Sequence, residues 1–130
     1  MQAILASPSL LRNALLLDAV ATAATAFLAV AAAPLLEPLL GLPADLLFYA
    51  GLPLLPFAGF VYLTSRGEPI SRKAATAVVI INALWVIDSI ALLFTGWVAP
   101  TALGYTFVIG QALVVALFAE LQFTGLRRSI

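Results

Sequence analysis

The side chains of this sequence that could do chemistry are polar groups set inside long apolar stretches. Four of them fall within eight positions, at Asn82, Trp85, Asp88 and Ser89. They lie in the stretch 74–99, in which Asp88 is the only charged residue. A carboxyl group inside a membrane span is a functional candidate, because an ionised aspartate at the centre of a span costs about 2.5–3.5 kcal/mol. The sequence therefore points first to Asp88.

Helix geometry gives Asp88 an expected partner. At ~1.5 Å per residue, Asp88 lies about 18 Å from the turn at Pro100, and Gln111 lies about 15 Å from the same turn on the next helix. Because a glutamine amide can both donate and accept, we expect these two side chains to form a hydrogen bond near the midplane. No lysine or arginine lies inside the expected spans, so we expect Asp88 to be uncharged when no ligand is bound. A purely structural role, in which Asp88 holds two helices in register, stays open.

Three further polar groups are expected nearer the cytoplasmic interface. By the same rise, Asn82 and Asp18 lie about 27 Å and about 24 Å from the outer ends of their helices, and Glu120 lies deeper still. These three could share hydrogen bonds if their helix faces agree, and for Asp18 and Glu120 we favour a structural role. The spacing of Asn82, Trp85 and Ser89 predicts one stripe that faces other helices. The candidate ligand-binding or proton-carrying residues are thus Asp88, Trp85, Asn82, Ser89, Gln111, Asp18 and Glu120.

The missing residue types argue against several kinds of chemistry. The sequence has no cysteine and no histidine, which removes disulfides, thiolate nucleophiles and histidine-ligated haem or zinc. Its glycines form no phosphate-binding loop. Six basic and six acidic residues give zero net charge, so there is no broad basic surface for nucleic acid. We therefore expect no catalytic residue, no metal and no cofactor, and we do not expect an enzyme.

Composition and patterning define the elements that position these groups. The chain of 130 residues is 64% hydrophobic and 9% charged, whereas soluble domains are about 25% charged. It is predicted to be an all-α integral membrane protein, a single domain over 1–130 with four transmembrane helices in one bundle. The expected spans are about 13–33, 46–65, 74–99 and 101–125. Pro53 and Pro56 predict a kink in the second span.

The positions of the cations predict the topology. Arg12 precedes the first span, the loop 66–73 carries three cations, and Arg127 and Arg128 follow the fourth span. With four spans all six fall on one side, which the positive-inside rule makes cytoplasmic. We expect both termini in the cytoplasm and a location in a bacterial inner membrane.

An offset of 70 residues hints at an internal repeat. It aligns Asp18 with Asp88, Ala21 with Ala91 and Thr25 with Thr95. Spans one and three would then be equivalent helices of two tandem helical hairpins. Alanine-rich stretches also match by chance, so duplication and coincidence both stay open.

Two functions fit these observations. The first is a small binder or transporter of a lipophilic or cationic compound, in which a midplane carboxyl lies beside Trp85, whose ring can attract a cation. The alternative is a non-catalytic structural or accessory subunit that packs in a larger membrane complex or a homo-oligomer. Small residues in the first span and short loops suit this alternative. In both cases the lipid bilayer is an expected partner.

Overall fold

The computed structural model describes residues 8–128, which form helices and no strands. The helices are α2 (Pro8–Ala31), α3 (Ala33–Leu40), α4 (Ala44–Gly51), α5 (Leu54–Ser65), α6 (Arg72–Phe94) and α7 (Ala102–Arg128). Four helical segments are long and apolar enough to cross a membrane: Leu10–Ala31, Ala44–Ser65, Arg72–Phe94 and Ala102–Arg128. The prediction of an all-helical fold with four such segments is therefore confirmed for residues 8–128.

The second span is broken where the sequence predicts a kink. Helix α4 ends at Gly51 and α5 begins at Leu54, with Pro53 at the N-cap of α5. Proline has no backbone N–H to continue the ladder of α4, and its fixed φ suits the start of a new helix. Pro56 lies in the first turn of α5, where its missing N–H costs no hydrogen bond. The break thus divides one span into two short helices.

Two segments differ in detail from the expected elements. The connection after Pro34 is a short helix, α3, which ends in a left-handed Gly41 with φ of 68°. Glu37 of α3 then accepts a hydrogen bond of 2.8 Å from the backbone N–H of Ala44 at the start of α4. The third span ends at Phe94, several residues before the expected end at 99, and the chain turns at Gly96, with φ of 77°.

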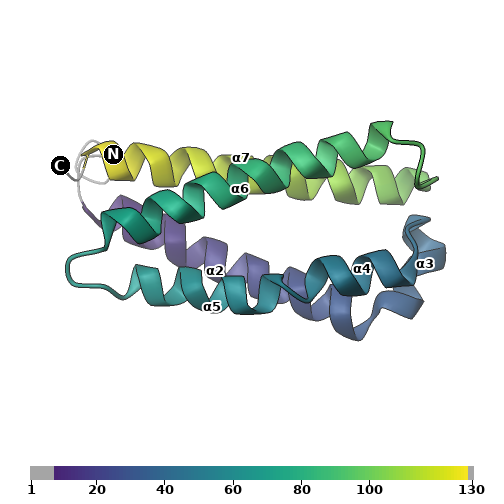
Figure 1. Ribbon diagram of the computed structural model, residues 1–130, viewed down its shortest axis with the longest axis horizontal. Coiled ribbons are helices and arrows are strands. Elements are labelled where there is room, and N and C mark those ends of the chain that lie inside the picture. The colour runs from purple at the N-terminus through teal and green to yellow at the C-terminus, as the bar shows by residue number, and fades with distance from the viewer. Residues whose placement is uncertain (1–7, 129–130) are drawn as a thin grey trace.

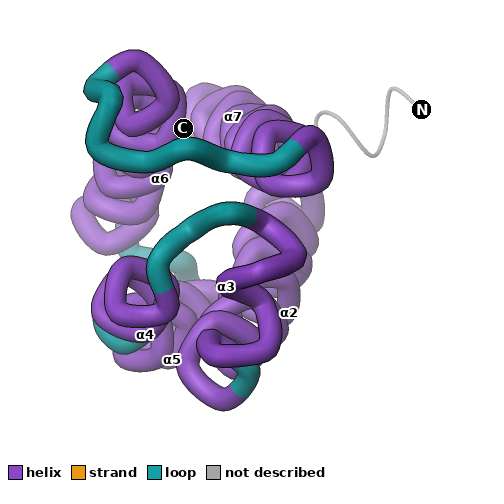
Figure 2. Tube along the Cα trace, turned by 90° about the vertical axis from the view of Figure 1, so that its right-hand side faces the viewer, coloured by secondary structure: helices purple, strands orange, loops and turns teal. Residues whose placement is uncertain are grey.

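The helices form two pairs that lie side by side. Helices α6 and α7 are one antiparallel pair, and α2 packs on α4 and α5 as the other (Figure 1). Viewed from the end, α6, α7, α2 and α4 with α5 occupy four corners (Figure 2). Helix α2 contacts α7 along the shared side, whereas α6 contacts α5 over a short stretch only.

One end of the molecule, here called the terminal end, carries both ends of the described chain and the 66–71 connection (Figure 1). All six cations of the sequence lie in or beside these segments. Arg12 of α2 donates to the carbonyls of Ser65 and Gly67, at 2.6 and 3.1 Å, and lies 3.1 Å from Glu68. Arg72 donates to the carbonyl of Leu126 at 2.8 Å. Arginines therefore fasten neighbouring helices to one another at this end.

Close contacts hold α7 against α2 at one end and against α3 at the other. At the terminal end, a Cβ added to Gly125 would lie 2.9 Å from backbone atoms of Leu11 in α2. At the opposite end, here called the loop end, a Cβ added to Gly104 would overlap the carbonyl of Leu40 in α3. There Thr101 donates to the Leu40 carbonyl through its backbone N–H, at 3.0 Å. Glycine is required at both positions because the backbones themselves are in contact.

Candidate functional site

A buried polar cluster, here called the Asp18 cluster, joins α2, α6 and α7. The carboxyl oxygen Oδ2 of Asp18 accepts hydrogen bonds from the amides of Asn82, at 2.7 Å, and Gln122, at 2.8 Å. Its other oxygen, Oδ1, accepts from the hydroxyl of Thr22 at 2.8 Å. Asn82 also donates to the Gln122 carbonyl oxygen at 3.1 Å. Asp18 and Gln122 are fully buried and Asn82 is 3% exposed.

The sequence prediction for this cluster is right for two members and wrong for the third. The expected contact between Asp18 and Asn82 is present, and it arises because the two residues lie at nearly the same depth on parallel helices. Glu120 is exposed instead of joining them. Gln122 takes its place, since two residues on α7 turn the side chain by about 200° around the helix axis. One signal could have found Gln122: it follows Gln111 by three helical turns and so shares its face.

A second polar contact lies one turn farther toward the loop end. The indole N–H of Trp85 donates to the side-chain oxygen of Gln111 at 2.7 Å, and the Gln111 amide donates to the carbonyl of Val108 at 2.9 Å. Ser89 turns its hydroxyl back onto the carbonyl of Trp85, at 2.7 Å. Gln111 is therefore the partner of Trp85 and not of Asp88, and the predicted Asp88–Gln111 hydrogen bond is absent.

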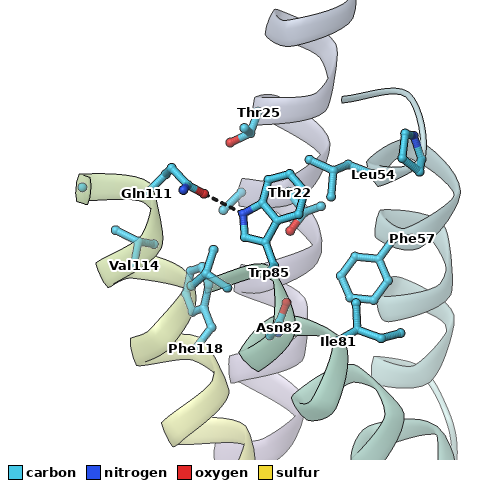
Figure 3. Close-up of a pocket in the computed structure, with 14 residues that line it drawn as sticks. Thr22, Thr25, Leu54, Phe57, Ile81, Asn82, Trp85, Gln111, Val114 and Phe118 are labelled. Atoms are coloured by element: carbon cyan, nitrogen blue, oxygen red, sulfur yellow. Dashed lines mark hydrogen bonds between the residues drawn. The ribbon is translucent and has the colours of Figure 1, made fainter. Parts of the chain in front are cut away.

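The Asp18 cluster and the Trp85–Gln111 contact border one cavity of about 380 Å³ (Figure 3). All four spans contribute to its wall. Thr22 and Thr25 come from α2, Asn82 and Trp85 from α6, and Gln111 from α7. The rest of the lining is mainly apolar, from Ala21, Pro53, Leu54, Phe57, Ile81, Gly110, Val114, Val115 and Phe118. Because Pro53 and Leu54 lie at the α4–α5 break, the break itself helps to shape this cavity.

A second cavity of about 250 Å³ continues toward the loop end. It shares Thr25, Leu54, Trp85 and Gln111 with the first. Asp88 and Ser89 lie in its wall, and Asp88 is exposed. Of the predicted residues, the structure thus brings Asn82, Trp85, Ser89, Asp88 and Gln111 to two adjoining cavities. It places Asp18 directly behind Asn82 and leaves Glu120 outside.

The two aspartates aligned by the suggested repeat lie at different depths and differ in exposure. Asn82 is level with Asp18, so Asp88 lies six residues farther along α6, or about 9 Å. Asp18 is buried and hydrogen-bonded, whereas Asp88 is exposed. The repeat stays a prediction from the sequence.

The arrangement suits binding of an apolar compound with a polar group. Residues 8–128 contain no group of three acidic side chains that could hold a metal ion. A comparison of the chain with models of protein families, with curated proteins and with solved structures finds no match. The two cavities and the side chains that line them are therefore the features of this protein that indicate a function.

Proposed function

We propose that this protein is a four-helix membrane bundle that binds or transports a lipophilic or cationic small molecule in the cavity beside Trp85. The observation that carries the proposal is the cavity of about 380 Å³, which combines a mainly apolar wall with Asn82, Trp85 and Gln111. Binding sites for small molecules typically have this composition, with a few polar groups that set orientation. Polar side chains inside a span are costly, so their gathering at one cavity supports a functional role.

In this proposal the two adjoining cavities form one path. The apolar part of the ligand lies against Phe57 and Phe118 in the larger cavity, and the indole ring of Trp85 offers a surface for a cation. Asp88, which is exposed in the wall of the second cavity, offers its carboxyl group to a cation there. By the positive-inside rule the terminal end, with its six cations, faces the cytoplasm, and the loop end faces the opposite side.

The tryptophans provide a direct binding assay. The sequence has two of them, and Trp97, which is 81% exposed, lines neither cavity. The Trp97→Phe variant therefore leaves Trp85 as a single fluorophore at the cavity. A lipophilic amine with a 4-bromophenyl group, added to this variant in phosphatidylcholine nanodiscs, is expected to quench Trp85 saturably, because bromine must touch the indole to quench it.

Two glycines make a matched pair of variants for this assay. A Cβ added at Gly110, which lines the larger cavity, or at Gly59, which does not, would have no other atom within 4 Å. Gly110→Leu is expected to fill the cavity and abolish saturable quenching, whereas Gly59→Leu is expected to leave it unchanged. If quenching rises only in proportion to the probe dissolved in the lipid, or if both variants behave alike, the cavity is not a binding site. The alternative of a structural or accessory subunit would then be favoured.

A further inference from the structure

The amide of Asn82 has one unused atom, and that atom faces the larger cavity. Both of its hydrogens are engaged, one by Asp18 at 2.7 Å and one by Gln122 at 3.1 Å. Its oxygen accepts no hydrogen bond from any residue of the described chain, although the side chain is only 3% exposed. Figure 3 shows this oxygen directed toward Trp85 and the cavity. A carbonyl held in this way leaves a hydrogen-bond acceptor for a ligand.

The hydroxyl of Thr22, next to Asn82, gives the cavity wall the same polarity. These two residues are here called the floor of the cavity. Thr22 uses its hydrogen on Asp18 at 2.8 Å, so toward the cavity it offers oxygen lone pairs. The indole N–H of Trp85 is likewise engaged, by Gln111. Gln111 keeps one amide hydrogen besides that given to Val108, but it lies at the far side of Trp85. The floor formed by Asn82 and Thr22 therefore accepts hydrogen bonds and donates none.

The hydrogen bonds behind this floor suit a negative charge. Asp18 accepts three hydrogen bonds, which is the arrangement that suits a carboxylate. No cation of the described chain forms an ion pair with it, and the nearest along α2, Arg12, is bound to Ser65, Gly67 and Glu68. Hydrogen bonding to Asp18 polarises the Asn82 amide, with the negative end of its dipole toward the cavity. A buried charge without a counter-ion is costly, so a cation in the cavity would offset that cost.

We propose that the ligand is a lipophilic amine in its protonated form, which donates an N–H hydrogen bond to the side-chain oxygen of Asn82. This inference rests on the proposed function and narrows it to a chemical class. Asp18, which accepts a hydrogen bond from the Asn82 amide, supplies the opposite charge without touching the ligand. Trp85 contacts the ammonium through its ring, since its N–H is already bound. A quaternary ammonium has the same charge but no N–H, and is therefore a poorer ligand.

Three probes with one common body test this proposal. They are 4-(4-bromophenyl)butyl-dimethylamine, the corresponding trimethylammonium ion, and the uncharged hydrocarbon of the same shape. Each is titrated at pH 7 into the Trp97→Phe variant in phosphatidylcholine nanodiscs, and the affinity is corrected for the amount of probe in the lipid. The dimethylamine is expected to bind about tenfold more tightly than the trimethylammonium ion, as a charged hydrogen bond would give. The hydrocarbon is expected to bind most weakly.

Two substitutions separate the hydrogen bond from the charge. Asn82→Leu, made in the Trp97→Phe background, is expected to bring the dimethylamine and the trimethylammonium ion to equal affinity. Asp18→Asn is expected to reduce the preference of both cations over the hydrocarbon. Asn13→Leu, the same change at an exposed residue of α2 outside both cavities, serves as the control and is expected to keep all ratios.

The three probes test the proposal in the Trp97→Phe variant alone, because its cavity residues are unchanged. The test therefore stands even if the Asn82 or Asp18 variant does not fold. Equal affinity of the two cations would overturn recognition of the N–H group, and equal affinity of all three probes would overturn recognition of a cation. In both cases saturable quenching of Trp85 would still support a binding cavity. Loss of saturable quenching with every probe would instead refute the proposed function itself.

Discussion

Gln122 gives the sharpest test of the buried cluster, because the sequence alone favoured Glu120 in its place. Gln122 makes hydrogen bonds of 2.8 Å to Asp18 and 3.1 Å to Asn82, and a longer one of 3.5 Å to the carbonyl of Ala14. Leucine at this position has a similar volume but removes all three. Hydrogen bonds between membrane helices are worth about 0.6 kcal/mol on average and about 1.7 kcal/mol at most. For the two short bonds, we expect Gln122→Leu to lower the free energy of unfolding by about 1–3 kcal/mol.

Glu120→Leu is the matched control, since its side chain is exposed on the opposite face of α7. Replacing it should change the free energy of unfolding by less than about 0.5 kcal/mol. Both variants can be unfolded reversibly in dodecylmaltoside micelles by added dodecyl sulfate and followed by circular dichroism. A Glu120 variant that loses as much stability as the Gln122 variant would contradict the placement of α7. So would a Gln122 variant as stable as the natural chain.

Three other predictions concern the topology, the helix break and the loop end. A periplasm-active reporter is expected to be inactive when fused after Arg128 and active when inserted near Gly41, and the reverse pattern would contradict the orientation proposed for the cations. Pro53→Ala is expected to join α4 and α5 into one helix without loss of thermal stability and to weaken quenching of Trp85 by the bromophenyl amine at least several-fold; unchanged quenching would show that the break does not shape the cavity. Gly104→Ala is expected to cost about 2 kcal/mol or more, because its Cβ would overlap the backbone of α3, whereas Gly59→Ala should be neutral or slightly stabilising. Thermal unfolding of both glycine variants measures this difference, and equal melting temperatures would refute the close contact.

The sequence predicted the elements well because membrane spans are defined by strong local signals. Four apolar stretches bounded by proline, glycine or charge correspond to the four helical segments of residues 8–128 that are long enough to cross a membrane. Pro53, inside such a stretch, marks the break correctly, since the missing N–H acts on its own helix. The early end of the third helix, near Gly96, was missed. Apolar character continues past it, and hydropathy cannot show where a helix stops within an apolar segment.

The site was predicted in part because depth can be counted from a sequence but helix rotation cannot. Depth alone brought Asp18 and Asn82 together, as the structure has them. The same argument paired Asp88 with Gln111. Instead, Trp85, which lies one turn away on the face of α6 nearer to Gln111, donates its indole N–H to the side-chain oxygen of Gln111. Which side chain faces a neighbour depends on how each helix is rotated, and this is set by contacts of the whole molecule.

The contacts at the two ends of α7 have a consequence for how any ligand arrives. They hold α7 against α2 at the terminal end and against α3 at the loop end, whereas α6 and α5 contact each other over a short stretch only. In the proposed function, a lipophilic ligand can therefore also enter the larger cavity sideways between α5 and α6, directly from the hydrocarbon. A compound that dissolves in the bilayer is already concentrated there before it meets the protein. For a ligand that enters in this way, occupancy of the cavity would be governed by its mole fraction in the lipid, and a dissociation constant expressed per litre of buffer would combine partitioning with binding.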